Sequence, residues 1–103
     1  MESPPGGRGI ERARTIRARV TGRVQGVGFR WSCMDRALAL GLVGEVSNRR
    51  DGTVEVCAQG PADDVAELVV WLYSGPRWAS VDDVEVEDLP AGSLAARSFR
   101  IRS

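Results

Sequence analysis

The segment Gly22-Arg23-Val24-Gln25-Gly26-Val27-Gly28-Phe29-Arg30 decides how the rest of the chain can be arranged. It places three glycines in seven residues between an alternating stretch and a helical one, and it ends on an arginine. Glycine permits positive φ and a close approach of the backbone to a bound group. Arginine offers a planar fork of donors that matches phosphate or carboxylate. The segment therefore predicts an oxyanion cradle at the start of a helix; a plain strand-to-helix turn with a surface arginine is the alternative.

Two familiar glycine loops are excluded by the residues that follow. A Walker A loop needs Gly-Lys-Ser/Thr, and the chain contains no lysine. A Rossmann fingerprint needs a third glycine where this chain has Trp31. The cradle is thus of another kind.

The stretches on either side of the cradle predict a strand and a helix. Residues 15–21 alternate, with Ile16, Ala18 and Val20 on one face, which is typical of a half-buried strand. Residues 30–40 carry apolar side chains at helical spacing, and Gly41 is placed to end this helix with a left-handed cap. The predicted buried stripe consists of Cys33, Met34, Ala37, Leu38 and Leu40.

The remainder of the chain completes a sandwich of one sheet and two helices. Residues 43–49 and 53–59 read as two strands joined at Asp51-Gly52, a strong hairpin signal. A second helix opens at Gly60-Pro61 and stops at residues 74–76, and strands follow at 81–87 and 98–102. The order β-α-β-β-α-β plus a short extra strand predicts an α+β, ferredoxin-like sandwich, with both helices on one face of a mainly antiparallel sheet.

Composition limits the classes of function. The 103 residues suffice for one domain, and the 14 basic and 14 acidic residues cancel. No net field therefore favours nucleic acid or membranes, and no stretch approaches the length of a membrane span. Two cysteines without any histidine exclude the usual metal sites. We expect a cytoplasmic protein with reduced thiols. Residues 1–13, rich in proline and glycine, are expected to form a disordered tail before a single domain at 14–103.

With this order fixed, the cradle resembles the signature loop of the acylphosphatase family, which likewise joins a first strand to a first helix. A second signature resembles the segment Gly44-Glu45-Val46-Ser47-Asn48. The hairpin exit at 51–56 and later segments around residues 71–84 are similar too, so the resemblance covers residues 15 to 102. Glu45 departs from the family, because many relatives carry an aromatic residue there. Strand parity places Glu45 on the face opposite Asn48, so we expect the change to be tolerated.

The resemblance implies hydrolysis of small acyl phosphates by a monomer that needs no metal and no cofactor. It implies that Arg30 binds the phosphate together with the loop amides, and that Asn48 positions the attacking water. The implied phosphate-binding residues are Gln25, Gly26, Val27, Gly28, Phe29 and Arg30.

Several other functions share part of this pattern. A covalent Cys-X5-Arg phosphatase loop is excluded, because Ala39 and Asp63 stand where arginine would be needed. A carbamoyl-phosphate-processing module resembles this domain but normally heads a much longer chain. An RNA-recognition fold shares the element order, yet it would need exposed aromatic residues on its central strands. A non-catalytic phosphate or acyl-phosphate binding module remains the alternative function. The three tryptophans are interpreted as packing residues.

Overall fold

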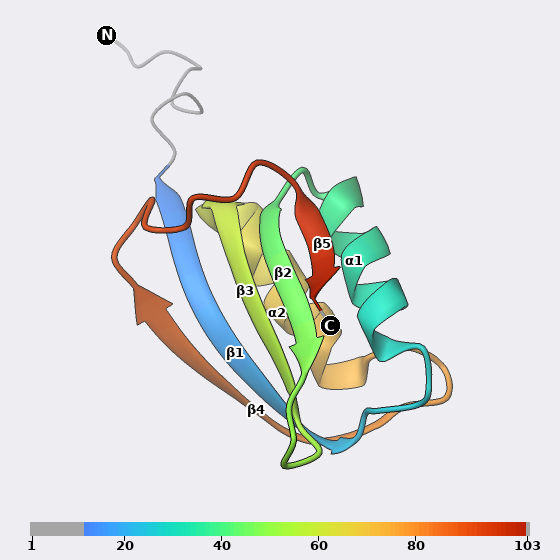
Figure 1. Cartoon of the computed structure of the whole chain (residues 1–103). Helices are drawn as coiled ribbons and strands as arrows, with labels where there is room; N and C mark the ends of the chain where they lie inside the picture. Colours follow the sequence, from blue (N-terminus) through green and yellow to red (C-terminus); the bar gives the residue numbers. More distant parts are fainter. Residues whose placement is uncertain (1–11, 103) are drawn as a thin grey trace, which may run out of the picture.

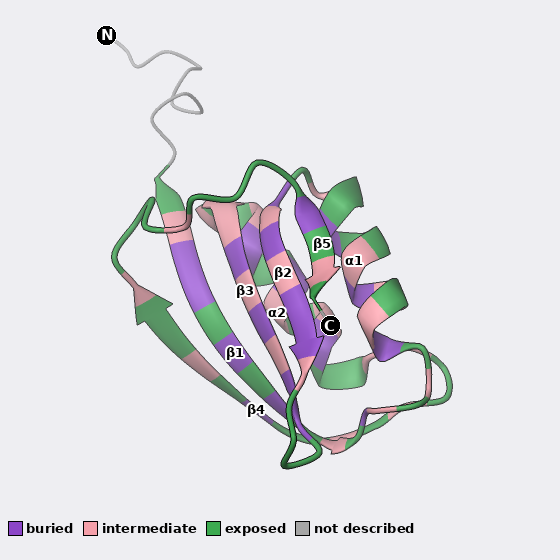
Figure 2. Ribbon diagram, viewed as in Figure 1, coloured by how far each residue is buried: buried purple, intermediate pink, exposed green. Residues whose placement is uncertain are grey.

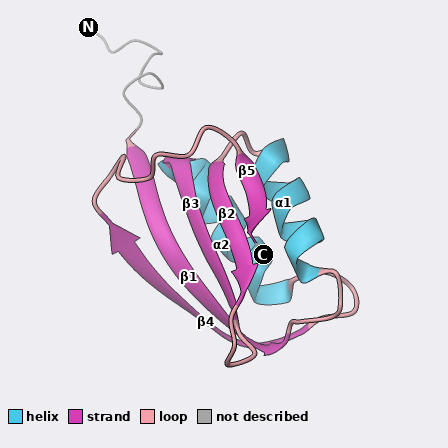
Figure 3. Ribbon diagram, viewed as in Figure 1, coloured by secondary structure: helices cyan, strands magenta, loops and turns pink. Residues whose placement is uncertain are grey.

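The computed structural model describes residues 12–102, and Figures 1 and 3 show its elements. Their order is β1 (Ala13–Arg23), α1 (Phe29–Ala39), β2 (Val43–Asn48), β3 (Val54–Pro61), α2 (Ala62–Ser74), β4 (Ser80–Leu89) and β5 (Phe99–Arg102). The predicted tail, residues 1–13, lies outside the described residues except for its last two positions. Of these, Ala13 already belongs to β1.

The strands form one sheet in the order β4-β1-β3-β2-β5. The pairs β1–β3, β1–β4 and β2–β3 are antiparallel, and β2–β5 is parallel. Both helices cover the same face of this sheet, as Figure 1 shows. The predicted ferredoxin-like α+β sandwich is confirmed. The short extra strand is β5, which extends the sheet beyond β2.

The alternation of the strands produces the core. Ile16, Ala18 and Val20 of β1 are buried, and so are their register partners Ala58, Val56 and Val54 in β3. The helices add Cys33 and Ala37 from α1 and three residues of α2, Val65, Leu68 and Leu72. Figure 2 shows buried positions alternating with exposed ones along β1 and with intermediate ones along β3. Such alternation is what a sheet with one covered face requires.

Two predictions about apolar side chains were wrong. Leu38 of α1 is 46% exposed, although the pattern placed it in the buried stripe. Trp31 and Trp78 are also exposed rather than packed, whereas Trp71 lies against Phe29 with their ring centroids 5.4 Å apart. Helical spacing predicts an apolar stripe but not how wide a part of it is buried. Because α1 packs over β2 and β5, only the side of its stripe that faces those strands is buried.

The predicted glycine cap of α1 is confirmed. Gly41 has φ 73°, its N–H bonds the carbonyl of Leu38, and the N–H of Leu42 bonds the carbonyl of Ala37. This pair of bonds is a Schellman motif, in which a buried residue follows the glycine. Leu42 is that residue, and it is 2% exposed.

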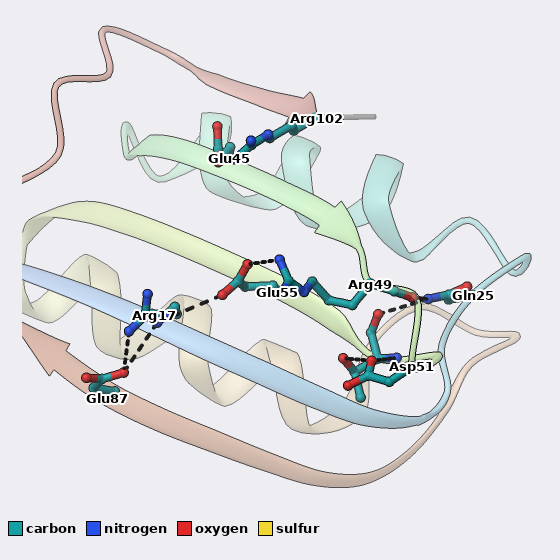
Figure 4. A network of polar contacts seen from close by, with 9 residues as sticks. Arg17, Gln25, Glu45, Arg49, Asp51, Glu55, Glu87 and Arg102 are labelled. Atoms are coloured by element: carbon teal, nitrogen blue, oxygen red, sulfur yellow. Dashed lines mark hydrogen bonds and ion pairs between the residues drawn. The ribbon is translucent and has the colours of Figure 1, made fainter.

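The open face of the sheet carries paired charges, as Figure 4 shows. Arg17 bonds Glu87, and Arg49 bonds Glu55. Glu45 lies 3.0 Å from Arg102 and 3.7 Å from Arg100. The predicted parity of Glu45 is therefore correct, and β5 supplies two partners for its carboxylate. Exposed pairs of this kind contribute little to stability. Among residues 12–102 no helix is long and apolar enough to cross a membrane.

Candidate active site

The cradle is the loop between β1 and α1, and its glycines adopt the backbone that was predicted. Gly26 has φ 75° and Gly28 has φ 80°. Gln25, which precedes Gly26, and Val27, which lies between the two glycines, have negative φ. Space is not the reason for glycine, because a Cβ at either position would meet no atom within 4 Å. Alternating negative and positive φ is typical of a nest, in which successive N–H groups turn toward one concave surface that binds anions.

The amides of this nest are free to bind a ligand. Within residues 12–102, no protein group accepts a hydrogen bond from the N–H groups of Gln25, Gly26, Val27, Gly28 or Phe29. Gly28 is the N-cap of α1, so the unpaired N–H groups of the first helical turn follow directly. No acidic side chain stands in that turn to compete with a bound anion. The loop and the helix start therefore combine into one anion-binding surface.

Arg30 is the second residue of α1 and adjoins this surface. Its side chain is partly exposed and forms no ion pair with another residue of the described range. Most arginines of β1 and β5 differ, since they lie beside carboxylates. The guanidinium of Arg30 is thus available for a ligand, and its fork of N–H groups suits a phosphate.

Asn48 ends β2 on the face that the helices cover. It pairs with Val54, which pairs with Val20, so the three side chains form one row across the sheet. Val54 and Val20 are buried, which shows that this row points toward the helices. The Oδ1 atom of Asn48 is itself buried and accepts no hydrogen bond from the described part of the chain. Buried polar atoms almost always have a partner, so this oxygen is poised to accept a hydrogen bond from something bound.

The sheet topology brings the cradle and Asn48 to the same end of the molecule. β1 and β2 are both antiparallel to β3, so they run in the same direction and their C-terminal ends lie at the same end of the sheet (Figure 1). The side chain of Gln25 connects the cradle to the β2–β3 hairpin. Its Nε2 donates to the carbonyls of Arg49 and Thr53 at 2.8 and 2.9 Å. The structure therefore unites the predicted site residues. The bridge made by the Gln25 side chain was not predicted, because only its backbone had been assigned a role.

The sequence also did not indicate that Asp51 and Thr53 help to hold the site together. Oδ1 of Asp51 accepts hydrogen bonds from the N–H of Thr53 at 3.0 Å and from its hydroxyl at 2.6 Å. These bonds close the hairpin that carries Asn48. Asp51-Gly52 signalled the turn itself, and an aspartate that bonds the backbone two residues later is a known turn device.

Hollows at the surface do not by themselves locate this site. A hollow of about 550 Å³ is lined by residues of β2, β3, β5 and the 94–98 loop, and includes neither Asn48 nor any cradle residue. A hollow of about 390 Å³ is lined by Asn48, Arg49, Arg50 and Asp51. A phosphate held by a nest needs only a shallow depression, so backbone geometry and unpaired polar atoms are the better guide.

The glycine of the second motif has a structural task. Gly44 has φ 144°, and a Cβ there would overlap the carbonyl of Cys57 in the adjacent strand. The N–H of Gly44 also bonds the carbonyl of Ser98 at 2.9 Å. Gly44 therefore lets β2 lie close to β3 and helps to seat the chain before β5.

Neither cysteine is suited to act as a nucleophile. Burial raises the pKa of Cys33 to about 12. Burial is the main cause that raises the pKa of Cys57, and the nearby carboxylates of Glu55 and Glu45 raise it further. Because their pKa values are raised, both thiols are predominantly protonated at neutral pH. The thiolate is the reactive form, so neither thiol is an effective nucleophile there.

We expect Cys33 to resist a thiol-labelling disulfide at about pH 8 in the folded protein, because its thiolate is scarce and its sulfur is covered. The half-buried Cys57 should react slowly, and both should react at once in denaturant. The absorbance of the thiolate that the reagent releases measures the rate of labelling. The variants Cys33→Ala and Cys57→Ala assign the faster and slower phases of that signal to the two cysteines. Both variants should keep their hydrolytic activity. Fast labelling of native Cys33 that abolishes activity would show that a thiol takes part after all.

The hairpin should loosen in acid in a way that depends on Asp51. Its hydrogen bonds from the hydroxyl and then the N–H of Thr53 lower the pKa of this carboxyl below its ordinary value of 3.8. Because the folded pKa is lower than the unfolded one, this stabilisation is complete above the unfolded pKa and disappears as pH falls through the folded pKa.

Thermal unfolding midpoints of wild type and Asp51→Asn between about pH 6 and about pH 2 test this expectation. The wild type should lose more stability than the variant across that range. Asp82→Asn, which removes an exposed carboxylate of β4, should follow the wild type. Parallel curves for wild type and Asp51→Asn would contradict the role given to the Thr53 bonds.

Known proteins resemble this chain both in sequence and in fold. The family model described as Acylphosphatase matches residues 16–101. An acylphosphatase of Koribacter versatilis is 55% identical over 87 residues, which cover 84% of this chain and 78% of that protein. The crystal structure of acylphosphatase from Bacillus subtilis superposes with a TM-score of 0.83 at 34% identity, covering 87% of this chain and 99% of that one. T. kodakarensis HypF shares the fold over 87% of this chain and 12% of its own, with a TM-score of 0.75 and 30% identity.

These matches extend over nearly all the described residues and include both the cradle and the hairpin. They agree with the β-α-β-β-α-β order of the described elements. The chain therefore belongs to the acylphosphatase family and is an acylphosphatase.

Proposed function

We propose that the nest formed by residues 25–29 and the Arg30 guanidinium hold the phosphate of a small acyl phosphate, and that Asn48 positions the water that attacks it. One observation carries this assignment above the others. The buried Oδ1 of Asn48 lacks a hydrogen-bond donor among the described residues, and it lies at the same end of the sheet as a loop of unpaired amides. An acceptor for water and a set of donors for phosphate are the two parts that hydrolysis needs.

The chemistry works without a histidine base, which the chain lacks. Water attacks phosphorus, the bond from phosphorus to the acyl oxygen breaks, and its electron pair leaves with the carboxylate. Both protons of the water remain on the phosphate product. A carboxylate departs without needing a proton. Phosphoryl transfer is largely loose and metaphosphate-like, so catalysis consists mainly of positioning and of stabilising charge. Asn48 cannot take up a proton, but its amide oxygen can orient the water.

The same argument defines the substrate class. A phosphate monoester has an alkoxide or phenoxide leaving group, which requires protonation or metal assistance that none of these residues provides. We therefore assign carboxyl-phosphate anhydrides as substrates and monoesters as very poor ones.

Release of phosphate in EDTA from an acyl phosphate such as benzoyl phosphate, compared with p-nitrophenyl phosphate, tests the proposal. Wild type should hydrolyse the first and scarcely the second, and both Arg30→Gln and Asn48→Ala should be impaired. Activity that requires added metal, or that survives intact in both variants, would overturn the mechanism. Phosphate binding by the wild type without turnover would favour the alternative function, a non-catalytic phosphate-binding module.

We place the active enzyme in the cytoplasm as a monomer whose partner is its small-molecule substrate. Two free thiols, Cys33 and Cys57, are consistent with a reducing compartment. The open face of the sheet presents ion pairs rather than an apolar surface, which is consistent with a face that stays in water. Size-exclusion chromatography with light scattering tests the monomer.

A further inference from the structure

Gln25 belongs to both halves of the site. Its backbone N–H lies in the nest, where it has no acceptor among the described residues. Its side chain leaves the loop and reaches the β2–β3 hairpin, as Figure 4 shows for Gln25 and Arg49. There Nε2 donates to the carbonyl of Arg49 at 2.8 Å and to that of Thr53 at 2.9 Å. A side-chain amide has two N–H groups, so this pair of bonds uses both.

The two carbonyls that Gln25 bonds are the closing points of the hairpin. The N–H of Arg49 bonds the carbonyl of Thr53 at 2.8 Å, and the N–H of Gly52 bonds the carbonyl of Arg49 at 3.1 Å. Asp51 fixes the other side of the turn through Thr53. The hairpin is therefore a closed unit in its own right, and Gln25 fastens that unit to the loop.

The fastening point lies next to Asn48. Arg49 is its neighbour in the chain, and Val54, which follows Thr53, is its partner across the ladder. A displacement of these two peptide groups would move the Oδ1 atom of Asn48 relative to the nest. The loop carries no ion pair with the hairpin within residues 12–102, so these two hydrogen bonds are the polar link between them.

We propose that Gln25 is a positioning residue that sets the distance and orientation between the phosphate nest and the water-binding oxygen of Asn48. This inference rests on the roles proposed above for the nest and Asn48. The Gln25 side chain does not touch the substrate. It acts on the attack step, because water and phosphorus must be aligned at the same time, and a misplacement of about 1 Å can cost about a hundredfold in rate.

The variant Gln25→Met removes both donors while nearly keeping the length and volume of the side chain. We expect kcat for an acyl phosphate to fall by at least about tenfold. The inhibition constant of inorganic phosphate should stay close to the wild-type value, because the nest amides and Arg30 are unchanged. A role confined to structure would instead lower the unfolding midpoint without separating kcat from phosphate affinity.

Gln59→Met is the matched control. Gln59 also fastens a loop, since its side chain bonds the backbone N–H and carbonyl of Leu94 at 2.9 and 3.2 Å and accepts from Thr15. It lies at the other end of β3 from the hairpin. This variant should show a comparable change in unfolding midpoint with an unchanged kcat. If both variants lower kcat equally, Gln25 has no special positioning role.

A double-mutant cycle with Asn48→Ala gives the decisive result. If Gln25 acts through Asn48, adding Gln25→Met to Asn48→Ala should lower kcat little further, since coupled residues are not additive. Full additivity of the two losses would overturn the inference while leaving the roles of the nest and Asn48 intact. Full activity of Asn48→Ala alone would overturn the proposed site itself, a distinct outcome. If Gln25→Met fails to fold, Gln25→Asn, which keeps the amide but is too short to span, replaces it in the cycle.

Discussion

Replacing Arg30 by glutamine is expected to lower kcat/KM for an acyl phosphate by about a thousandfold, or about 4 kcal/mol of transition-state stabilisation. The charge that develops on the equatorial oxygens would then face the nest amides alone. Glutamine keeps hydrogen-bonding capacity but has neither the charge nor the bidentate fork of the guanidinium. Because Arg30 has no carboxylate partner among the described residues, its loss leaves no orphaned charge in the protein.

Arg36→Gln is the matched control for this change. Arg36 lies in the last turn of the same helix, at the opposite end from the nest. It should leave kcat/KM within a small factor of wild type, while Arg30→Gln should also weaken inhibition by inorganic phosphate. Arg30→Lys should recover part of the activity, since it restores a point charge without the fork. Equal effects of Arg30→Gln and Arg36→Gln would show that only the net charge matters and that Arg30 has no specific contact.

Replacing Asn48 by alanine is expected to lower kcat by about a hundredfold or more while leaving phosphate affinity nearly unchanged. The residue does not belong to the nest, so substrate binding should survive. Without the amide oxygen the water loses the acceptor that holds it in line with the leaving group. The inhibition constant of inorganic phosphate, measured beside kcat, separates these two effects.

The stability of the same variant distinguishes a catalytic Asn48 from an asparagine that merely shapes the turn. An unpartnered buried oxygen costs desolvation energy in the folded state, so its removal should leave the unfolding midpoint unchanged or raise it. A turn-forming asparagine would behave in the opposite way, with a lower midpoint and little change in kcat. Loss of stability together with normal kcat would therefore contradict the assignment.

The sequence was informative wherever a local pattern carries the signal. Alternation over residues 15–21 fixed the face of β1, and Gly41 marked the end of α1. Asp51-Gly52 located the hairpin, and the glycine loop ending in Arg30 located the cradle. Each of these depends on steric preferences within a few residues, which the order of amino acids expresses directly. Leu38 shows the limit, since a helical pattern states which residues are neighbours and not how far the packed surface extends.

By itself, then, the sequence determined the elements, the buried face of β1 and the left-handed positions of the cradle. Only the tertiary structure decided that β5 lies beside β2, where it neutralises Glu45, and that Gln25 ties the cradle to the hairpin. The same holds for Asn48, whose buried oxygen faces the helices because β1, β3 and β2 align Val20, Val54 and Asn48 in one row. The bonds of Gln25 to the hairpin and of Glu45 to Arg102 join residues from 24 to 57 positions apart. Register between distant strands is set by the packing of the whole sheet, which no local pattern encodes.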